Sequence, residues 1–179
     1  MLQENTQTNS WVRANLVLSA EGSTTLAGSS RGLSSPEDRR RFHQLRSEAD
    51  LIVIGGRTAH IEPYEKTPVP LIVFSRNPLT RHRASENPLA KTINTDPVEF
   101  LRERDRKDFP RVVVEGGIHL VLSLLEGRIL DGLFLTVTRV SGDPGDMRSK
   151  DFIQLITQSG LREVSRENIN DDEFLFFAR

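Results

Sequence analysis

The sequence predicts an α/β fold with a mostly parallel central sheet, an antiparallel C-terminal edge and helices on both faces. Three observations lead to this prediction. Short apolar runs typical of buried strands alternate with segments that have helical periodicity. Several of these runs stop at Gly-bearing loops, as in sheets whose strands are joined by helices. Two strand patterns with no helix predicted between them stand near the C-terminal end, which favours an antiparallel pair.

Composition restricts the classes of function. The chain has 179 residues, enough for one domain, and its 24 basic and 25 acidic residues give a formal net charge of -1. This balance provides no overall attraction for nucleic acid or for an anionic membrane. No stretch approaches the roughly 18 apolar residues of a membrane span. We therefore expect a cytoplasmic protein with one domain over 11–179. The polar residues 1–10 are expected to be a disordered or loosely attached leader without signal-peptide character.

The chain contains no cysteine, so it has neither a disulfide framework nor a thiolate that could act as a nucleophile or metal ligand. Its histidines are scattered, and none forms a His-x-x-x-His pair. They are His43, His60, His82 and His119. The spacing therefore predicts no metal site.

In the N-terminal half, apolar runs predict three strands. These strands are 11–18, 51–54 and 69–74. The Gly- and Ser-rich segment 19–34 is too polar for an element of its own, so we predict a functional loop. A helix is predicted to follow Ser35, since Ser is a good N-cap and Pro36 suits the first helical position.

The C-terminal half continues the alternation. A second helix is predicted at Asp96 and Pro97 by the same N-cap and proline signals. The helix that begins at Ile118 has apolar residues at i, i+3, i+4 and i+7 and is expected to end near Gly127. The further predicted strands are 91–94, 112–114, 133–140, 161–166 and 173–178. The remaining segments, 75–88 and 141–150, are predicted to be irregular.

Three Gly-bearing loops begin where a predicted strand stops. They span 19–34, 55–62 and 115–117. The carboxyl ends of parallel strands share one edge of a sheet, and ligands bind in the crevice beyond that edge. The Gly116-Gly117 turn also precedes a helix, whose N-terminal N–H groups suit a phosphate. We therefore predict that these loops form an anion-binding site.

Taken in order, the segments resemble the RibD C-terminal family, the reductase domain of riboflavin biosynthesis, which has a dihydrofolate reductase-like fold. The resemblance runs from about 11 to 140 and depends on short motifs in a specific order. These motifs are Asn15 with Ser19-Ala20-Glu21-Gly22-Ser23, Ser30-Arg31-Gly32-Leu33-Ser34-Ser35-Pro36, His43-Gln44-Leu45-Arg46, Gly55-Gly56-Arg57-Thr58, Glu115-Gly116-Gly117 and Leu130-Asp131-Gly132-Leu133.

The resemblance implies an NADPH-dependent reductase that transfers a hydride to an imine-like carbon of a phosphoribosylaminopyrimidine. It also implies a homodimer. The implied cofactor-binding residues are Gly32, Gly55, Thr58, Ser75, Arg76, Gly116 and Gly117. The implied substrate-binding residues are Asn15, Ser30, Arg46 and Glu115, and the catalytic candidates are Glu21 and Glu115. The side chains that suit the 2′-phosphate of NADPH are Arg76, Arg81 and Arg83.

The chain departs from the family mainly at substrate-side positions. Ser23 replaces a Lys or Arg, Gly32 replaces a Trp, and a longer motif that includes an Arg is reduced to Glu62-Pro63-Tyr64. Two alternatives therefore stay open: a reductase of the same fold that acts on dihydrofolate or another pterin, and a nucleotide-binding protein without catalytic activity. A further possibility is that Glu115 serves only to cap the next helix or to pair with an arginine. The lack of cysteine excludes the zinc deaminase half of the bifunctional enzymes.

Overall fold

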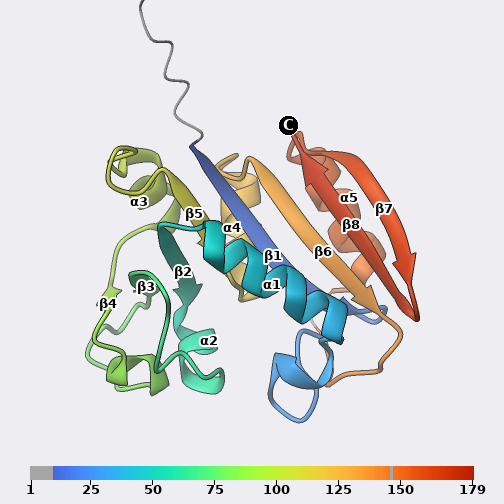
Figure 1. Ribbon diagram of the computed structural model, residues 1–179, viewed down its shortest axis with the longest axis horizontal. Helices are drawn as coiled ribbons and strands as arrows, with labels where there is room; N and C mark the ends of the chain where they lie inside the picture. Colours follow the sequence, from blue (N-terminus) through green and yellow to red (C-terminus); the bar gives the residue numbers. More distant parts are fainter. Residues whose placement is uncertain (1–9, 146) are drawn as a thin grey trace, which may run out of the picture.

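The computed structural model describes residues 10–145 and 147–179 (Figure 1). Apart from Ser10, the expectation for the leader therefore lies outside the described residues. The strands are β1 (Trp11–Ser19), β2 (Leu51–Gly55), β3 (Leu71–Phe74), β4 (Ala90–Ile93), β5 (Arg111–Val114), β6 (Gly132–Thr138), β7 (Arg162–Ile169) and β8 (Asp172–Ala178). The α-helices are α1 (Pro36–Glu48), α2 (Gly56–Ile61), α3 (Pro97–Glu103), α4 (Ile118–Glu126) and α5 (Ser149–Gln158).

The strands form one eight-stranded sheet in the order β4-β3-β2-β5-β1-β6-β8-β7. Every neighbouring pair from β4 to β6 is parallel, whereas β8 pairs antiparallel with both β6 and β7. Figure 1 shows α1 across one face of the sheet and α4 and α5 behind the other. The predicted fold class is confirmed.

Strand β5 shows why a continuous apolar run belongs at the centre of such a sheet. Its Val112 and Val114 side chains pack in the large core beneath α4 and α5. Val113 faces the opposite side, where it packs with Trp11 of β1 and with Leu45 of α1. All three valines are fully buried, because helices cover both faces of the sheet at this point.

The two helix starts predicted from N-cap and proline signals are confirmed in detail. The Ser35 side chain accepts a hydrogen bond of 3.3 Å from the Asp38 N–H, and Pro36 occupies the first position of α1. In the same way, the Asp96 carboxylate accepts a bond of 2.9 Å from the Glu99 N–H at the start of α3. These side chains satisfy N–H groups that have no partner within the helix.

Helix α5 was not predicted, because the loop prediction extended to residue 150 and no element was expected before 161. The helix is held by Phe152 and Ile156, which lie one turn apart and are fully buried against the sheet. Its N-cap, Arg148, makes no capping bond from its side chain, so the usual start signal is missing from the sequence.

Two segments predicted to be irregular contain short 3₁₀ helices, η1 (Ser30–Gly32) and η2 (Arg83–Glu86). Apolar periodicity could predict neither 3₁₀ helix, because local side-chain bonds stabilise turns of this length. Along residues 10–145 and 147–179, no helix is both long and apolar enough to cross a membrane.

The packing of α5 predicts a large loss of stability on truncation of Phe152. The substitution Phe152→Ala should lower the free energy of unfolding by about 3–5 kcal/mol, since it empties a fully buried site. Chemical denaturation measures this change. Leu79→Ala is the control, because Leu79 is 93% exposed and its truncation should leave stability nearly unchanged. Equal effects of the two substitutions would contradict the role of α5 in the core.

Candidate functional site

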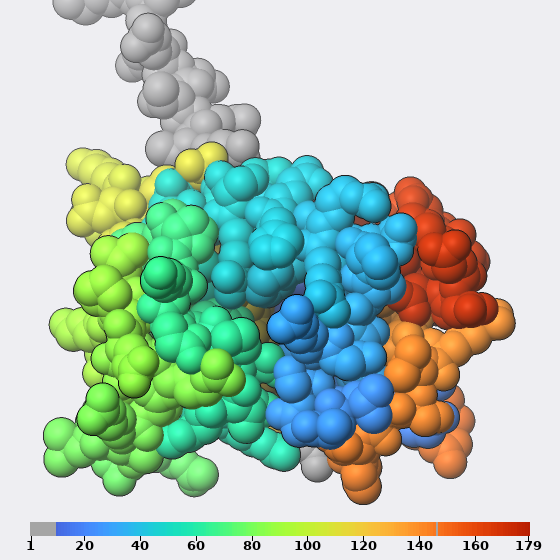
Figure 2. All heavy atoms as spheres, turned by 60° about the horizontal axis from the view of Figure 1, so that its bottom comes forward, coloured from blue at the N-terminus to red at the C-terminus, as the bar shows by residue number. Residues whose placement is uncertain are grey.

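Two pockets lie beyond the carboxyl ends of the central parallel strands. The larger, of about 400 Å³, is bounded by β1, α1, the η1 turn and the segment that follows α2. The smaller, of about 290 Å³, lies over the β2–α2 and β5–α4 turns. Five residues line both, so the two pockets adjoin: Thr24, Thr25, Thr58, Ile61 and Gly117. In Figure 2 the surface is hollowed between the N-terminal loop, in blue, and the green segment that follows α2.

The larger pocket contains a buried carboxylate, that of Glu115, directly after β5. Its side chain is 1% exposed. Arg46, in the last turn of α1, binds it with both ends of the guanidinium, Nε to Oε1 at 2.7 Å and Nη2 to Oε2 at 2.6 Å. The Tyr64 hydroxyl donates a third bond of 2.9 Å to Oε2. Glu115 therefore pairs with an arginine from another element, which was one of the alternatives open at the sequence level.

The surroundings of Glu115 change the acidity of its partners. Burial lowers the pKa of Arg46, but the hydrogen bonds and charge of Glu115 outweigh it, so the pKa is raised above its ordinary value. Burial and, after it, the charge of Glu115 raise the pKa of Tyr64 well above the usual range. The hydroxyl therefore keeps its proton and remains a donor. The Arg46 guanidinium also lies 4.1 Å from the ring centre of Phe42 and 5.2 Å from that of Tyr64.

Asn15, in the middle of β1, brings a second polar group to the larger pocket. The residue is 8% exposed, and its side-chain oxygen is buried with no hydrogen-bond partner in the described part of the chain. Buried polar atoms are nearly always hydrogen-bonded. The oxygen is therefore available to accept a bond from an N–H or O–H group of a ligand.

A second acidic side chain at this pocket, Asp38 of α1, is fully engaged by the protein. Its Oδ1 accepts bonds from the Thr136 hydroxyl at 2.6 Å and from Arg41 at 3.2 Å. The Ser34 hydroxyl donates to Oδ2. Burial lowers the pKa of Arg41, although the charge of Asp38 opposes the shift. This network joins α1 to β6 behind the pocket wall.

Two carboxylates from outside the segment 19–34 help to hold it in place. The Asp143 carboxylate accepts bonds from the Gly28 N–H, the Thr25 hydroxyl and the Ala27 N–H, which lower its pKa. Farther along the segment, the Ser30 N–H donates to Glu62 Oε1 at 2.6 Å. These contacts hold the loop against two segments distant in sequence.

The smaller pocket is formed by two glycine turns that approach each other closely. Gly116 has φ +92, in the left-handed region that favours glycine, and a cis peptide bond joins it to Gly117. The Gly55 N–H donates a bond of 3.2 Å to the Gly116 carbonyl. A Cβ on Gly117 would come within 3.3 Å of Thr58 Oγ1, so a side chain would fill the space between the turns. Within the described structure, no side chain caps the N-terminus of α4.

The structure brings together most of the residues predicted for the site. The larger pocket is lined by Asn15, Ser30, Arg46, Thr58, Glu115, Gly116 and Gly117. The smaller pocket is lined by Gly55, Thr58 and Gly117. Thr58 lies inside α2 and is buried, while Gly55 occupies the N-cap position.

Four predicted residues lie outside the lining of both pockets: Glu21, Gly32, Ser75 and Arg76. Glu21 is exposed in the turn that follows β1. Gly32 packs against Leu26, since a Cβ there would lie 2.9 Å from the Leu26 Cβ. Ser75 and Arg76 follow β3 beside the smaller pocket, where a Cβ on Gly56 would lie 3.2 Å from Ser75 Oγ.

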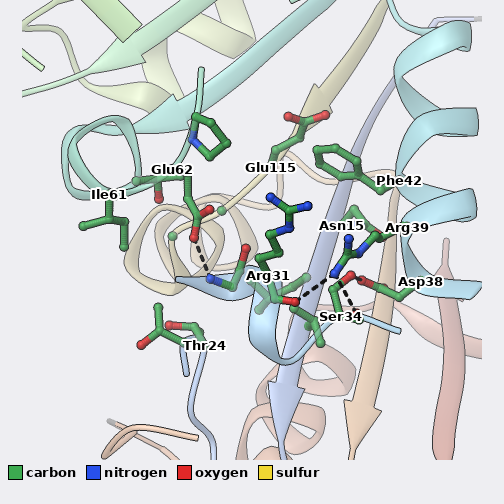
Figure 3. A pocket seen from close by; sticks show the side chains of 18 of the residues that line it. Asn15, Thr24, Arg31, Ser34, Asp38, Arg39, Phe42, Ile61, Glu62 and Glu115 are labelled. Atoms are coloured by element: carbon green, nitrogen blue, oxygen red, sulfur yellow. Dashed lines mark hydrogen bonds between the residues drawn. The ribbon is translucent and has the colours of Figure 1, made fainter. Parts of the chain in front are cut away.

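Several lining residues were not predicted from the sequence. The principal one is Tyr64, the only tyrosine of the chain, which binds Glu115 across 51 positions. No periodicity or short motif in the sequence predicts such a contact. The other main additions are Thr24, Arg31, Asp38, Arg39 and Phe42, which Figure 3 labels, and Thr25. Across the described ranges, no group of three or more His, Asp or Glu side chains is arranged to hold a metal ion.

A search of curated proteins gives no sequence match. Solved structures share the fold at low identity. A pyrimidine reductase-like protein from Corynebacterium diphtheriae has 18% identity and a TM-score of 0.69, with 94% of this chain and 91% of that chain covered. RibD from Acinetobacter baumannii has 15% identity and a TM-score of 0.70, with 96% and 58% covered.

A third structure is the diaminohydroxyphosphoribosylaminopyrimidine deaminase/5-amino-6-(5-phosphoribosylamino)uracil reductase of Thermotoga maritima. It has 15% identity and a TM-score of 0.65, and the match covers 94% of this chain but 56% of that protein. The chain thus spans little more than half the length of the two RibD-type structures. The sequence model of the RibD C-terminal domain matches residues 10–140, which include β1 to β6 and both pockets. The chain belongs to the RibD C-terminal domain family.

Proposed function

We propose that the protein is an NADPH-dependent reductase of riboflavin biosynthesis that acts on a phosphoribosylaminopyrimidine. The observation that supports this most strongly is the pair of adjoining pockets that share Thr58 and Gly117. One pocket has open backbone turns, and the other has a buried, paired carboxylate beside aromatic rings. Two ligands held in this way meet at the shared wall, and such positioning is the protein's main contribution to hydride transfer.

The smaller pocket fits a dinucleotide cofactor. The glycine turns at 55–56 and 116–117 leave space that side chains would fill, and the uncapped α4 N-terminus suits a phosphate. When bound, NADPH supplies the hydride. Of the three arginines that suit its 2′-phosphate, Arg81 and Arg83 pair with Glu86 and Glu65. Arg76 has no such ion pair among the described residues, so we assign the 2′-phosphate to Arg76.

The larger pocket fits a flat polar substrate. The Asn15 oxygen is placed to accept a bond from a ring or exocyclic N–H group. Glu115 holds Arg46 and Tyr64 in fixed positions, so their exposed atoms form a preorganised wall. The aromatic rings of Phe42 and Tyr64 line the same wall, beside the Arg46 guanidinium.

The glycine turn gives a test of cofactor binding. In Gly116→Ala, an L side chain at φ +92 is strained, and the turn must shift to relieve the strain. We expect the Kd for NADPH, measured by fluorescence titration, to rise about tenfold or more. Gly160→Ala is the matched control, because Gly160 has φ +95 and no described atom within 4 Å of an added Cβ. NADPH affinity that falls equally in both variants, or in neither, would contradict the assignment.

The buried carboxylate gives a test of turnover. Glu115→Gln keeps the shape of the side chain but leaves the Arg46 guanidinium without its counter-charge. We expect kcat/KM for 5-amino-6-(5-phosphoribosylamino)uracil, measured from the oxidation of NADPH, to fall about 100-fold. Glu126→Gln, at the exposed end of α4, should leave the rate unchanged. Oxidation of NADPH with dihydrofolate but not with the pyrimidine would instead establish the pterin alternative.

A further inference from the structure

The η1 turn holds the backbone of Arg31 firmly and leaves its side chain unengaged. The Arg31 N–H donates to the Ser29 hydroxyl at 3.2 Å, and its carbonyl accepts a bond of 3.1 Å from Arg39 Nη2. Glu62 fixes the same turn by accepting bonds from the Ser30 N–H at 2.6 Å and the Ser29 hydroxyl at 3.2 Å. These bonds fix the point from which the Arg31 side chain extends.

The side chain extends into the larger pocket. Figure 3 shows the Arg31 guanidinium between Glu62 and Phe42, on the side toward Glu115. Within 10–145 and 147–179, no ion pair or side-chain hydrogen bond involves it. Arg31 thus brings a positive charge without a protein partner into the cavity.

The acidic side chains that line this pocket are engaged by the protein. The Glu115 carboxylate binds Arg46 and Tyr64. The Asp38 carboxylate binds Arg41 and two hydroxyl groups. The Glu62 carboxylate binds the η1 turn, as described above. An incoming ligand therefore meets these acidic groups already paired, whereas the Arg31 guanidinium is available.

We propose that Arg31 determines specificity by binding a phosphate group of the substrate at the η1 side of the larger pocket. The inference rests on the proposed function and identifies the residue that binds the charged end of the substrate. A guanidinium presents parallel N–H donors that match two phosphate oxygens. Arg40 differs in two respects, because it lies outside the lining of the pocket and pairs with Glu37 at 3.6 Å.

The test compares Arg31→Gln with Arg40→Gln, which removes a charge from the same region outside the pocket. Methyl phosphate and acetate are titrated separately at constant ionic strength, with NADP⁺ present throughout, and binding is followed by NMR. We expect wild type and Arg40→Gln to bind methyl phosphate alike and Arg31→Gln to bind it at least about tenfold more weakly. Equal binding by wild type and Arg31→Gln, no binding by wild type, or tighter binding of acetate than of methyl phosphate would overturn the proposal.

Turnover separates this proposal from the proposed function. With 5-amino-6-(5-phosphoribosylamino)uracil, Arg31→Gln should raise KM about tenfold or more with little change in kcat, because it removes a binding contact remote from the reacting carbon. With the dephosphorylated compound, wild type and variant should have the same KM. If neither wild type nor Arg31→Gln oxidises NADPH with either compound, while methyl phosphate binding still depends on Arg31, the proposed function fails and the phosphate site stands. An equal KM increase for both compounds would show that Arg31 acts only on the shape of the pocket.

Discussion

The candidate site depends on one constraint, that a carboxylate buried beneath the surface needs charged or hydrogen-bonding partners. Glu115 is placed there by the central strand β5, and it obtains its partners from α1 and from the segment between α2 and β3. Removal of Arg46 leaves an uncompensated buried charge, which commonly costs several kcal/mol, and removal of Tyr64 takes away a hydrogen bond to the same carboxylate. The pairing therefore fixes the position of α1 over the sheet as well as the wall of the larger pocket.

The parallel arrangement of β2, β5 and β1 explains why the functional loops meet. These strands are neighbours in the sheet although they are far apart in the chain, so their carboxyl ends share an edge. The two glycine turns can then approach within hydrogen-bond distance, from the Gly55 N–H to the Gly116 carbonyl. The antiparallel β8 and β7 stand beyond β6. Strand β8 adds Leu175 and Phe177 to the core, whereas β7 is exposed along its whole length.

Local signals in the sequence predict the elements whose stability is local. The apolar run of β5 and the capped starts at Ser35 and Asp96 were predicted correctly for this reason. Helix α5 was missed because it is stabilised by burial of Phe152 and Ile156 rather than by a cap. In the site, Arg46 and Glu115 could be found from short motifs. The contact with Tyr64 joins distant segments, and the engagement of Asp38 depends on β6, so neither could be predicted without the fold.

The loop from 19 to 34 belongs to both pockets, since Thr24 and Thr25 line each of them. Asp143 holds residues 25–28 of this loop and Glu62 holds Ser29 and Ser30, so the same stretch of chain supports both pockets. This shared wall has a thermodynamic consequence. If a ligand in one pocket changes the free energy of the loop, the affinity of the other pocket changes by a certain factor, and linkage requires the reverse effect to have the same size. The affinities of the two pockets for their ligands would then be linked through this one loop.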